Sequence, residues 1–194
     1  AIKENAKDIG KTVEIDIKGA EIKIDKPIFD SLYEPILHIL LNAIQHGIES
    51  SEERIKKGKE QTGHIRIDVK KEGKYIVIAI KDDGRGIDID KVKEIAVQKR
   101  LISSDYASFI SKEEILSYIF APGFSTSDDI DFQSGRGMGL NIVKTAISKL
   151  KGTIEVLSEL DKETTFIIKI PQSLTISNLL IFSSHNLDFA VPIN

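Results

Sequence analysis

Three groups of residues in this chain have the types and spacings of residues that could bind a ligand or take part in catalysis. The first is His38, Asn42 and His46, which lie four residues apart and therefore share one face of a helix. An asparagine amide oxygen is a hard ligand, suited to Mg²⁺ that is held jointly with phosphate oxygens. A polar stripe that faces solvent is the alternative explanation, so this group alone does not decide between a metal site and a surface.

The second group, Asp82 to Gly86, directly follows the most apolar segment of the chain, residues 75–80. The glycines Gly84 and Gly86 permit a tight turn and a close approach of a ligand to the backbone. A carboxylate beside such a slot can accept a hydrogen bond from an exocyclic amine, such as adenine N6. The alternative is an ordinary Asp-Gly turn, in which Ile87 is only a core residue.

The third group, Gly135-Arg136-Gly137-Met138-Gly139, opens directly into a helical pattern. Free N–H groups and the positive dipole end at a helix N-terminus favour a phosphate. A P-loop is excluded, because Leu140-Asn141 stands where Lys-Ser or Lys-Thr is needed. The spacing and the long polar segment before it also differ from a Rossmann fingerprint. A flexible loop is the remaining alternative.

Hydrophobic periodicity predicts the elements that carry these groups. Residues 13–17 and 21–24 alternate as two strands of a hairpin, and residues 65–69 alternate as a further strand. Residues 75–80 are almost all apolar, which fits a central strand. From Pro27 the apolar residues recur every three or four positions, which predicts a helix that breaks near Pro35 and ends near Gly47. A short polar helix and a loop follow at residues 50–63.

The second half of the chain alternates helices with polar segments. Helices are predicted at residues 90–100 and 138–150, and strands at residues 153–157 and 165–170. Residues 103–134 are mostly polar, with one short helix around residues 113–120, which is typical of a functional lid. The end of the chain, residues 179–182 and 189–193, has the pattern of a hairpin cut from a following domain.

Composition limits the class of protein. The chain has 194 residues, of which 41% are hydrophobic, enough for one sizeable core. Charged residues make up 29% with a net charge of only -3, which argues against a nucleic-acid partner. There is no cysteine, and no apolar run or signal segment predicts direct membrane insertion or secretion. We expect a cytoplasmic α/β chain that is a piece of a longer protein.

The order of the three groups resembles the ATP-binding domain that histidine kinases share with the gyrase, Hsp90 and MutL ATPases. Four segments further resemble the CheA family of chemotaxis histidine kinases: residues 34–49, 82–88, 120–126 and 134–139. His38, where most sensor kinases have Glu, and the run His46-Gly47-Ile48-Glu49 are the most discriminating points. The resemblance covers about residues 8–171, and the final hairpin resembles the opening strands of a CheW-like regulatory domain.

The resemblance implies an α+β fold, a two-layer α/β sandwich of the Bergerat or GHKL type with a mixed sheet and helices on one face. It implies a catalytic domain at residues 1–171, followed by a linker and a truncated regulatory hairpin at residues 172–194. The implied cofactors are ATP and Mg²⁺. The implied reaction transfers the γ-phosphoryl group to a histidine on a separate phosphotransfer domain. A response regulator, a CheW-like adaptor and a chemoreceptor are the other implied partners. The implied location is the cytoplasm, at membrane-associated receptor arrays.

The resemblance also assigns the site residues. Asp82 would contact adenine, Asn42 would hold Mg²⁺ with His38 nearby, and His38 and His46 would line the phosphates. His38 as a general base is an alternative role. The nucleotide pocket would further include Gly84, Gly86, Ile87, Lys91, Ser125, Thr126, Gly135, Arg136, Gly137, Met138, Gly139 and Thr165. His64 and His185 do not sit in a helical phosphoacceptor pattern.

Several positions depart from the family pattern. Gln45 stands where an Asp is usual, and Ser127 where a basic residue is frequent. Leu140-Asn141 and Glu163 also differ from the usual residues. These departures leave the pocket in place but bear on the rate of transfer. Two other functions therefore stay open, an ATP hydrolase of the same superfamily and a degenerate module that binds nucleotide or partners without transfer.

Overall fold

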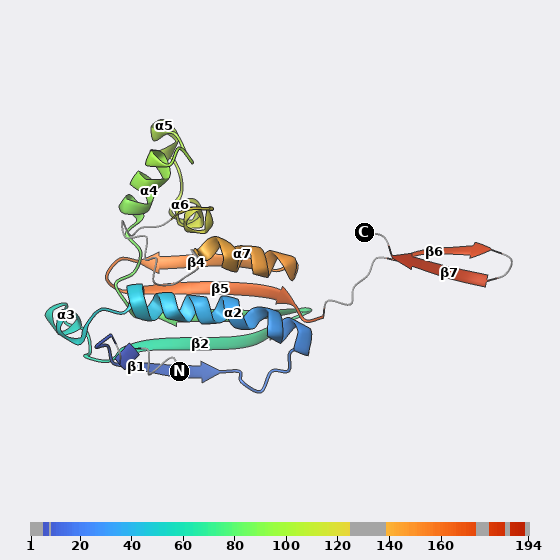
Figure 1. Cartoon of the computed structure of the whole chain (residues 1–194), viewed down its shortest axis with the longest axis horizontal. Coiled ribbons are helices and arrows are strands. Elements are labelled where there is room, and N and C mark those ends of the chain that lie inside the picture. The colour runs from blue at the N-terminus through green and yellow to red at the C-terminus, as the bar shows by residue number, and fades with distance from the viewer. Residues whose placement is uncertain (1–5, 8, 125–138, 174–178, 185–186, 193–194) are drawn as a thin grey trace.

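The structure is a computed structural model of the chain, and it describes residues 6–7, 9–124, 139–173, 179–184 and 187–192. Its main feature is a five-stranded sheet in the order β1-β2-β3-β5-β4 (Figure 1). The strands are β1 (Val13–Lys18), β2 (Gly63–Glu72), β3 (Tyr75–Asp82), β4 (Thr153–Glu159) and β5 (Glu163–Pro171). β1 runs parallel to β2 and the other neighbours are antiparallel, so the sheet is mixed, as expected for the α+β class.

Helices cover one face of this sheet. α2 and α7 pack side by side over it, and α4, α5 and α6 lie beyond the β4 edge in the same view (Figure 1). The helices are α2 (Lys26–Asn42), the π-helix η1 (Ala43–Gly47), α3 (Ser51–Lys56), α4 (Ile89–Gln98), α5 (Ser104–Ala107), α6 (Lys112–Ser117), the 3₁₀ helix η2 (Tyr118–Phe120) and α7 (Leu140–Lys149). None of the helices in these described ranges is long and apolar enough to span a bilayer.

The core lies between the sheet and the helices, because alternate residues of each strand point to the same face. On β3 and β5 the residues that face the helices are 5% exposed or less: Ile76, Ile78, Ile80, Phe166, Ile168 and Ile170. From the helix side, Leu32 and Ile39 of α2 are buried against them. Asp82 follows Ile80 on this face of β3, and Thr164 precedes Phe166 on this face of β5. Two polar residues therefore lie next to the hydrophobic core at one end of the sheet.

The hairpin expected from residues 13–17 and 21–24 is wrong, because residues 21–24 form no strand. β1 instead pairs in parallel with β2, from Val13 opposite Gly63 to Lys18 opposite Asp68. Gly19 has a φ of +78°, and a Cβ there would lie 2.0 Å from the carbonyl oxygen of Val69. Alternation reveals that a segment is extended but does not determine which strand it pairs with. Here the long connection through α2 brings β2 alongside β1 in parallel.

The predicted helix from Pro27 is present and ends at Gly47, but it does not break near Pro35. α2 continues through Pro35, which removes only one hydrogen bond of the helix. Helical geometry changes further along, at η1, where the N–H of Ile48 donates to the carbonyl of Ala43 at 2.6 Å. π-helical turns of this kind are frequent at functional sites.

Residues 103–124 hold more helix than the single short segment that was expected. α5 is an additional helix, and α6 continues into η2. The side chains of Ser103 and Ser111 accept hydrogen bonds from the N–H groups of Tyr106 and Glu114 at 3.2 and 3.1 Å. A serine in front of a short polar helix is a capping signal that periodicity alone does not reveal.

The expected C-terminal hairpin is present as a separate two-stranded antiparallel sheet, β6 (Leu179–Ser184) and β7 (Leu187–Pro192). The rings of Phe182 and Phe189 stack across it, with their centroids 5.4 Å apart. The hairpin shares no strand pairing with the five-stranded sheet.

Candidate active site

Asp82 is a buried carboxylate at the end of β3, with 3% of its surface exposed. Among the described residues, only the N–H of Gly84 donates a hydrogen bond to it, to Oδ1 at 3.0 Å. Burial raises the pKa of Asp82 to about 7, and the negative charge of Asp83 acts in the same direction. The Gly84 hydrogen bond and the charge of Lys59 act against the rise. Burial of a carboxylate disfavours its charged form, and a buried carboxylate beside a glycine-containing turn is typical of a functional site.

Thr164 and Ser158 extend from Asp82 as a polar row across three strands. Asp82 lies directly opposite Thr164, and Thr164 opposite Ser158, so the three side chains share the face covered by helices. Thr164 is 5% exposed, and its hydroxyl lies 3.2 Å from that of Ser158. The Ser158 hydroxyl also accepts the N–H of Ile87 at 2.8 Å. The row thus joins the end of the sheet to the loop after Gly86.

Thr165, which the sequence assigned to the pocket, lies on the other face of the sheet, opposite Lys81. Thr164 is the residue that shares a face with Asp82, and sequence reasoning missed it. A signal was available, because Phe166, Ile168 and Ile170 are the apolar residues of β5 that face the core. Counting back in steps of two from Phe166 leads to Thr164 rather than Thr165.

The end of the long helix touches the Asp82 turn through two glycines. The N–H of Arg85 donates to the carbonyl of Gly47 at 2.9 Å. A Cβ at Gly84 would lie 2.3 Å from that carbonyl oxygen, and a Cβ at Gly47 would lie 3.1 Å from Oδ1 of Asp82. Side chains at either position would push the helix away. The helix that carries Asn42 and the strand that carries Asp82 therefore meet at one end of the sheet, on one side.

Lys11 fixes the same end of the helix from the N-terminal side. Its ammonium group donates to the carbonyls of Ile44 and Gln45, both at 2.8 Å. These carbonyls lie in the π-helical turn, where the regular α-helical hydrogen bonds end. Partial burial and the charge of Arg85 lower the pKa of Lys11. The position of η1 is thus set by contacts with both Lys11 and the Asp82 turn.

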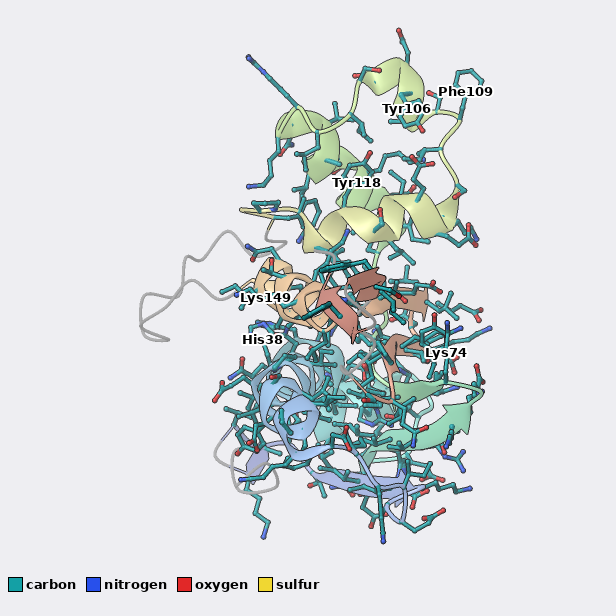
Figure 2. All side chains as sticks on the ribbon, turned by 90° about the vertical axis from the view of Figure 1, so that its right-hand side faces the viewer. His38, Lys74, Tyr106, Phe109, Tyr118 and Lys149 are labelled. Carbon is teal, nitrogen blue, oxygen red and sulfur yellow. The ribbon has the colours of Figure 1, made fainter. Side chains whose placement is uncertain are left out.

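The three polar residues of the helix differ in their surroundings. His38 and Asn42 are half-buried on α2, whereas His46 is exposed and belongs to η1. Burial lowers the pKa of His38, which favours its neutral imidazole. Figure 2 labels His38 on α2, on the side of the domain where α2 packs against α7. A neutral imidazole can accept a proton or act as a metal ligand.

Gly86 and the loop after it rest on the turn between β4 and β5. Gly86 has a φ of +68°, and a Cβ there would lie 2.2 Å from the carbonyl oxygen of Glu159. The N–H of Asp161 donates to the carbonyl of Arg85 at 2.7 Å. Lys91 is exposed on α4, where its backbone N–H donates to the capping carboxylate of Asp88. Gly86 thus has a structural reason to be glycine, independent of any ligand.

The glycine-rich group and the lid lie mostly outside the described residues. This applies to Ser125, Thr126, Gly135, Arg136, Gly137 and Met138. Gly139 is described and precedes the first residue of α7 as its N-cap. Lys99 donates to the carbonyl of Gly123 at 2.8 Å, which ties the end of α4 to the start of the segment that leads to residue 125.

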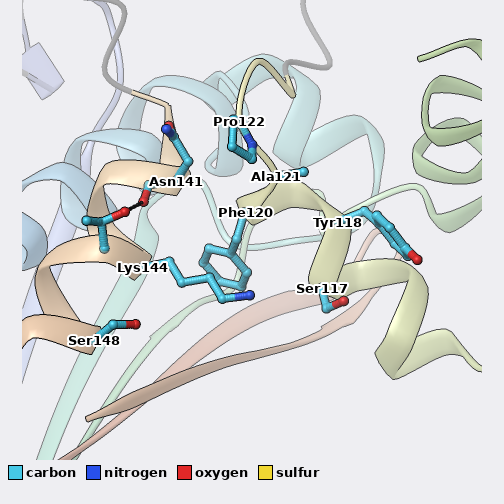
Figure 3. Close-up of a pocket in the computed structure, with 9 residues that line it drawn as sticks. Ser117, Tyr118, Phe120, Ala121, Pro122, Asn141, Lys144 and Ser148 are labelled. Carbon is cyan, nitrogen blue, oxygen red and sulfur yellow. Dashed lines mark hydrogen bonds between the residues drawn. The ribbon is translucent and has the colours of Figure 1, made fainter. Parts of the chain in front are cut away.

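A cavity of about 480 Å³ opens between η2 and α7 (Figure 3). Its lining includes Phe120, Pro122, Asn141 and Lys144, and the Lys144 ammonium lies 5.8 Å from the centroid of the Phe120 ring. Asp82 and Asn42 are not among its lining residues. None of its lining residues was predicted to bind a nucleotide, so this cavity is not the predicted nucleotide site.

Asn42 is the residue that the sequence analysis assigned to a magnesium ion, and it is half-buried at the end of α2. No group of three or more acidic, histidine or cysteine side chains suited to a metal occurs in the described part of the chain. Mg²⁺ commonly keeps several waters and is held by one or two protein ligands together with substrate phosphates. A single amide oxygen at the end of α2 could serve as one such protein ligand.

The chain is similar in sequence to a known family and to several curated proteins. Residues 29–174 match the family described as "Histidine kinase-, DNA gyrase B-, and HSP90-like ATPase". The chain is 40% identical over 193 residues to the sensor histidine kinase CheAY of Helicobacter pylori, across 100% of this chain and 24% of that protein. It is 39% identical over 192 residues to chemotaxis protein CheA of Treponema pallidum, across 99% of this chain and 23% of that protein. The chain thus spans about a quarter of these relatives.

Solved structures show the same fold. The blue-light activated histidine kinase EL346 of Erythrobacter litoralis superposes with a TM-score of 0.51 over 90% of this chain and 40% of that chain, at 15% identity. At this identity the likeness concerns the fold alone. Since the family match covers most of the chain, and CheA proteins align with it from end to end, the chain belongs to the family of histidine kinase-, DNA gyrase B- and HSP90-like ATPases.

Proposed function

We propose that this domain binds Mg–ATP beside the Asp82 turn and transfers the γ-phosphoryl group to a histidine on a separate phosphotransfer domain. The observation that carries the proposal is the buried Asp82 carboxylate held beside the end of the helix that bears Asn42. Its relatives that are named as CheA and as a sensor histidine kinase support the same reaction.

In this proposal Asp82 accepts a hydrogen bond from the exocyclic amine of adenine. Asp82 has room for that role, since only the Gly84 N–H donates to it among the described residues. Thr164, rather than Thr165, adds a hydroxyl beside the adenine, because Thr164 shares the face of Asp82. Gly84 and Gly86 have no side chains, so the base can approach the backbone of the turn closely.

The triphosphate lies toward the helix in this proposal. Asn42 provides an amide oxygen to Mg²⁺, and His38 and His46 line the phosphates. Neutral His38 is suited either to take up a proton during transfer or to complete the shell around Mg²⁺. Ile87 borders the base, Lys91 supplies positive charge from α4, and the segment with Ser125, Thr126 and the glycine-rich group Gly135, Arg136, Gly137, Met138 and Gly139 covers the phosphates. The donors of such a segment suit phosphate oxygens.

The transfer step needs positioning and neutralisation of charge more than covalent catalysis by the protein. A nitrogen of the acceptor histidine attacks the γ-phosphorus, and the bond from that phosphorus to the bridging oxygen breaks, so ADP leaves. The acceptor histidine belongs to another domain. Within this chain, His64 lies on β2 with its Nε2 3.1 Å from a carboxylate oxygen of Glu60, which is a surface contact at the start of a strand.

We further propose that residues 1–171 form the catalytic domain and residues 172–194 begin a CheW-like regulatory domain. The separate β6–β7 sheet and its stacked phenylalanines support that boundary. In the full-length protein a CheW-like adaptor and a chemoreceptor would act through the regulatory domain, and a response regulator would receive the phosphoryl group. Such a protein would act in the cytoplasm, at receptor arrays.

Incubation of the chain with γ-labelled ATP and the purified phosphotransfer domain of a CheA protein tests the proposal. Label on a histidine of that domain is the expected result, and Asp82→Asn should reduce it at subsaturating ATP. Release of free phosphate without labelled protein would point to an ATP hydrolase. Absence of both products, together with nucleotide binding, would point to a module without transferase activity and contradict the proposal.

A further inference from the structure

A buried cluster of charges lies behind the Asp82 turn and has no part in the nucleotide site as described so far. Glu49 and Arg54 are each 1% exposed, and Lys59 is 16% exposed. We call Glu49, Arg54 and Lys59 the α3 clamp, because they lie just before, within and just after α3. Burial of three ionised groups is costly unless each has partners, so their contacts indicate what the cluster holds.

Lys59 uses all three of its hydrogen-bond donors on this cluster. Its Nζ donates to the backbone carbonyls of Asp83 and Gly84, at 2.9 and 2.6 Å, and to Oε1 of Glu49 at 3.0 Å. An ammonium group has three N–H donors, so the set is complete. Two of the three bonds go to the backbone of the turn that follows Asp82.

Arg54 holds the same turn from a second direction. Its guanidinium donates to the carbonyl of Asp83 at 3.2 Å and to Oδ2 of Asp83 at 2.7 Å. It also donates to Oε2 of Glu49 at 3.3 Å and to the carbonyl of Glu60 at 2.7 Å. The other oxygen of Asp83 accepts the N–H of His64 at 2.8 Å, which anchors the turn to β2.

The clamp reaches Asp82 through the backbone. The carbonyl of Gly84 accepts from Lys59, and the N–H of the same residue donates to Oδ1 of Asp82. Displacement of the turn would therefore move the Gly84 N–H, which orients the carboxylate. Among the described residues, Lys57, two residues before Lys59, has no such contact with the turn, and its ammonium pairs with the carboxylates of Glu49, at 3.7 Å, and Asp161.

We propose that Lys59, supported by Glu49 and Arg54, is a positioning residue that fixes the Asp82 carboxylate for selection of adenine over bases that lack its exocyclic amine. The proposal rests on the proposed function, in which Asp82 accepts from that amine. Lys59 itself contacts neither base nor phosphate in this arrangement. Its effect is on the choice of base, not on the phosphate end of the nucleotide.

Lys59→Met tests the proposal, with Lys57→Met as the matched control. We would measure the affinities of ATP and of inosine triphosphate, which carries an oxygen in place of the amine, for each variant of the chain. Lys59→Met should lower the preference for ATP about tenfold, the typical effect of misplacing one charge-assisted hydrogen bond. The affinity for inosine triphosphate should stay within about twofold. Lys57→Met should leave the preference unchanged.

A purely structural role of Lys59 would lower thermal stability without changing the preference, measured well below the unfolding temperature. That outcome would overturn the proposal. If Lys59→Met does not fold, Arg54→Lys serves instead, since a lysine keeps the charge but loses the forked contact with Asp83. It should lower the preference in the same direction, and an unchanged preference in the folded variant would count against the clamp.

Asp82→Asn separates this inference from the proposed function. Loss of the ATP preference in Asp82→Asn, but not in Lys59→Met, would overturn the inference and leave the proposed function in place. An unchanged preference in Asp82→Asn would reject Asp82 as the adenine contact, and the inference with it. When both single variants lose the preference, Lys59→Met in the Asp82→Asn background should have no further effect on it.

Discussion

Asp82 of β3 and Thr164 of β5 are direct cross-strand partners on the helix-covered face of the sheet, and both are buried. The pairing places a carboxylate and a hydroxyl side by side where the hydrophobic rows of the core end. The same strand register sends Thr165 to the opposite face. Register, which is a property of the whole sheet, therefore decides which of the two adjacent threonines shares the face of Asp82.

Thr164→Val should weaken ATP binding about fivefold, because one hydroxyl hydrogen bond beside the base contributes roughly 1 kcal/mol. Valine has nearly the same shape, so the strand should be retained. Thr165→Val is the matched control and should leave the affinity within about twofold. Titration calorimetry of both variants measures the difference. A larger loss in Thr165→Val would mean that the wrong face has been assigned to the nucleotide.

The buried Asp82 should make the stability of the nucleotide-free domain depend on pH. Its pKa is raised from 3.8 to about 7 in the folded chain, so the folded state binds its proton more tightly than the unfolded state. Its contribution to the free energy of unfolding is therefore full below pH 4 and is lost as the pH rises to about 7.

Asp82→Asn removes this titration and keeps an oxygen that can accept the Gly84 N–H. At pH 8 the variant should be more stable than the parent by about 2–4 kcal/mol, while its ATP affinity falls about ten- to hundredfold. Urea unfolding at pH 5 and pH 8 measures the first effect. Asp30→Asn, at an exposed position of α2, is the control that should show neither effect. A variant less stable than the parent at pH 8 would contradict the burial argument.

Gly84→Ala should destabilise the domain by about 1–3 kcal/mol, because the new Cβ would overlap the carbonyl oxygen of Gly47. It should also lower ATP affinity, since the turn and the helix end would separate. Gly73→Ala is a useful control: Gly73 has a φ of +59° and open space around it, so only backbone strain is added. That variant should lose some stability in denaturant titrations but keep its ATP affinity.

Asn42→Ala should remove the dependence of triphosphate binding on Mg²⁺. The reason is that Asn42 provides the amide oxygen for the ion in the proposed site. Gln45→Ala removes a similar amide three residues later, at an exposed position of η1, and should keep the Mg²⁺ dependence. ATP titrations with and without Mg²⁺ compare the two variants. A gain in affinity on adding Mg²⁺ to Asn42→Ala would reject the assignment.

The sequence by itself predicted most of the elements and the family. The apolar run of β3 and the helical period of α2 are local patterns that can be read within a short window, and the order of the three groups can be read along the whole chain. The resemblance carried by the order of those groups implied the α+β class, the ATP-binding family and a role for the Asp82 carboxylate. The capping serines Ser103 and Ser111 are also local sequence signals, but an analysis of hydrophobic periodicity does not detect them.

Only the tertiary structure decided which of these residues meet. The parallel partner of β1, the choice of Thr164 over Thr165 and the contact between Gly47 and the Asp82 turn depend on strand register and helix packing between segments far apart in the chain. The α3 clamp is the same kind of feature, since Lys59 and the carbonyls that it binds are about 25 residues apart. A local pattern fixes the shape of a segment, but the partner that satisfies its polar groups is set by the fold as a whole.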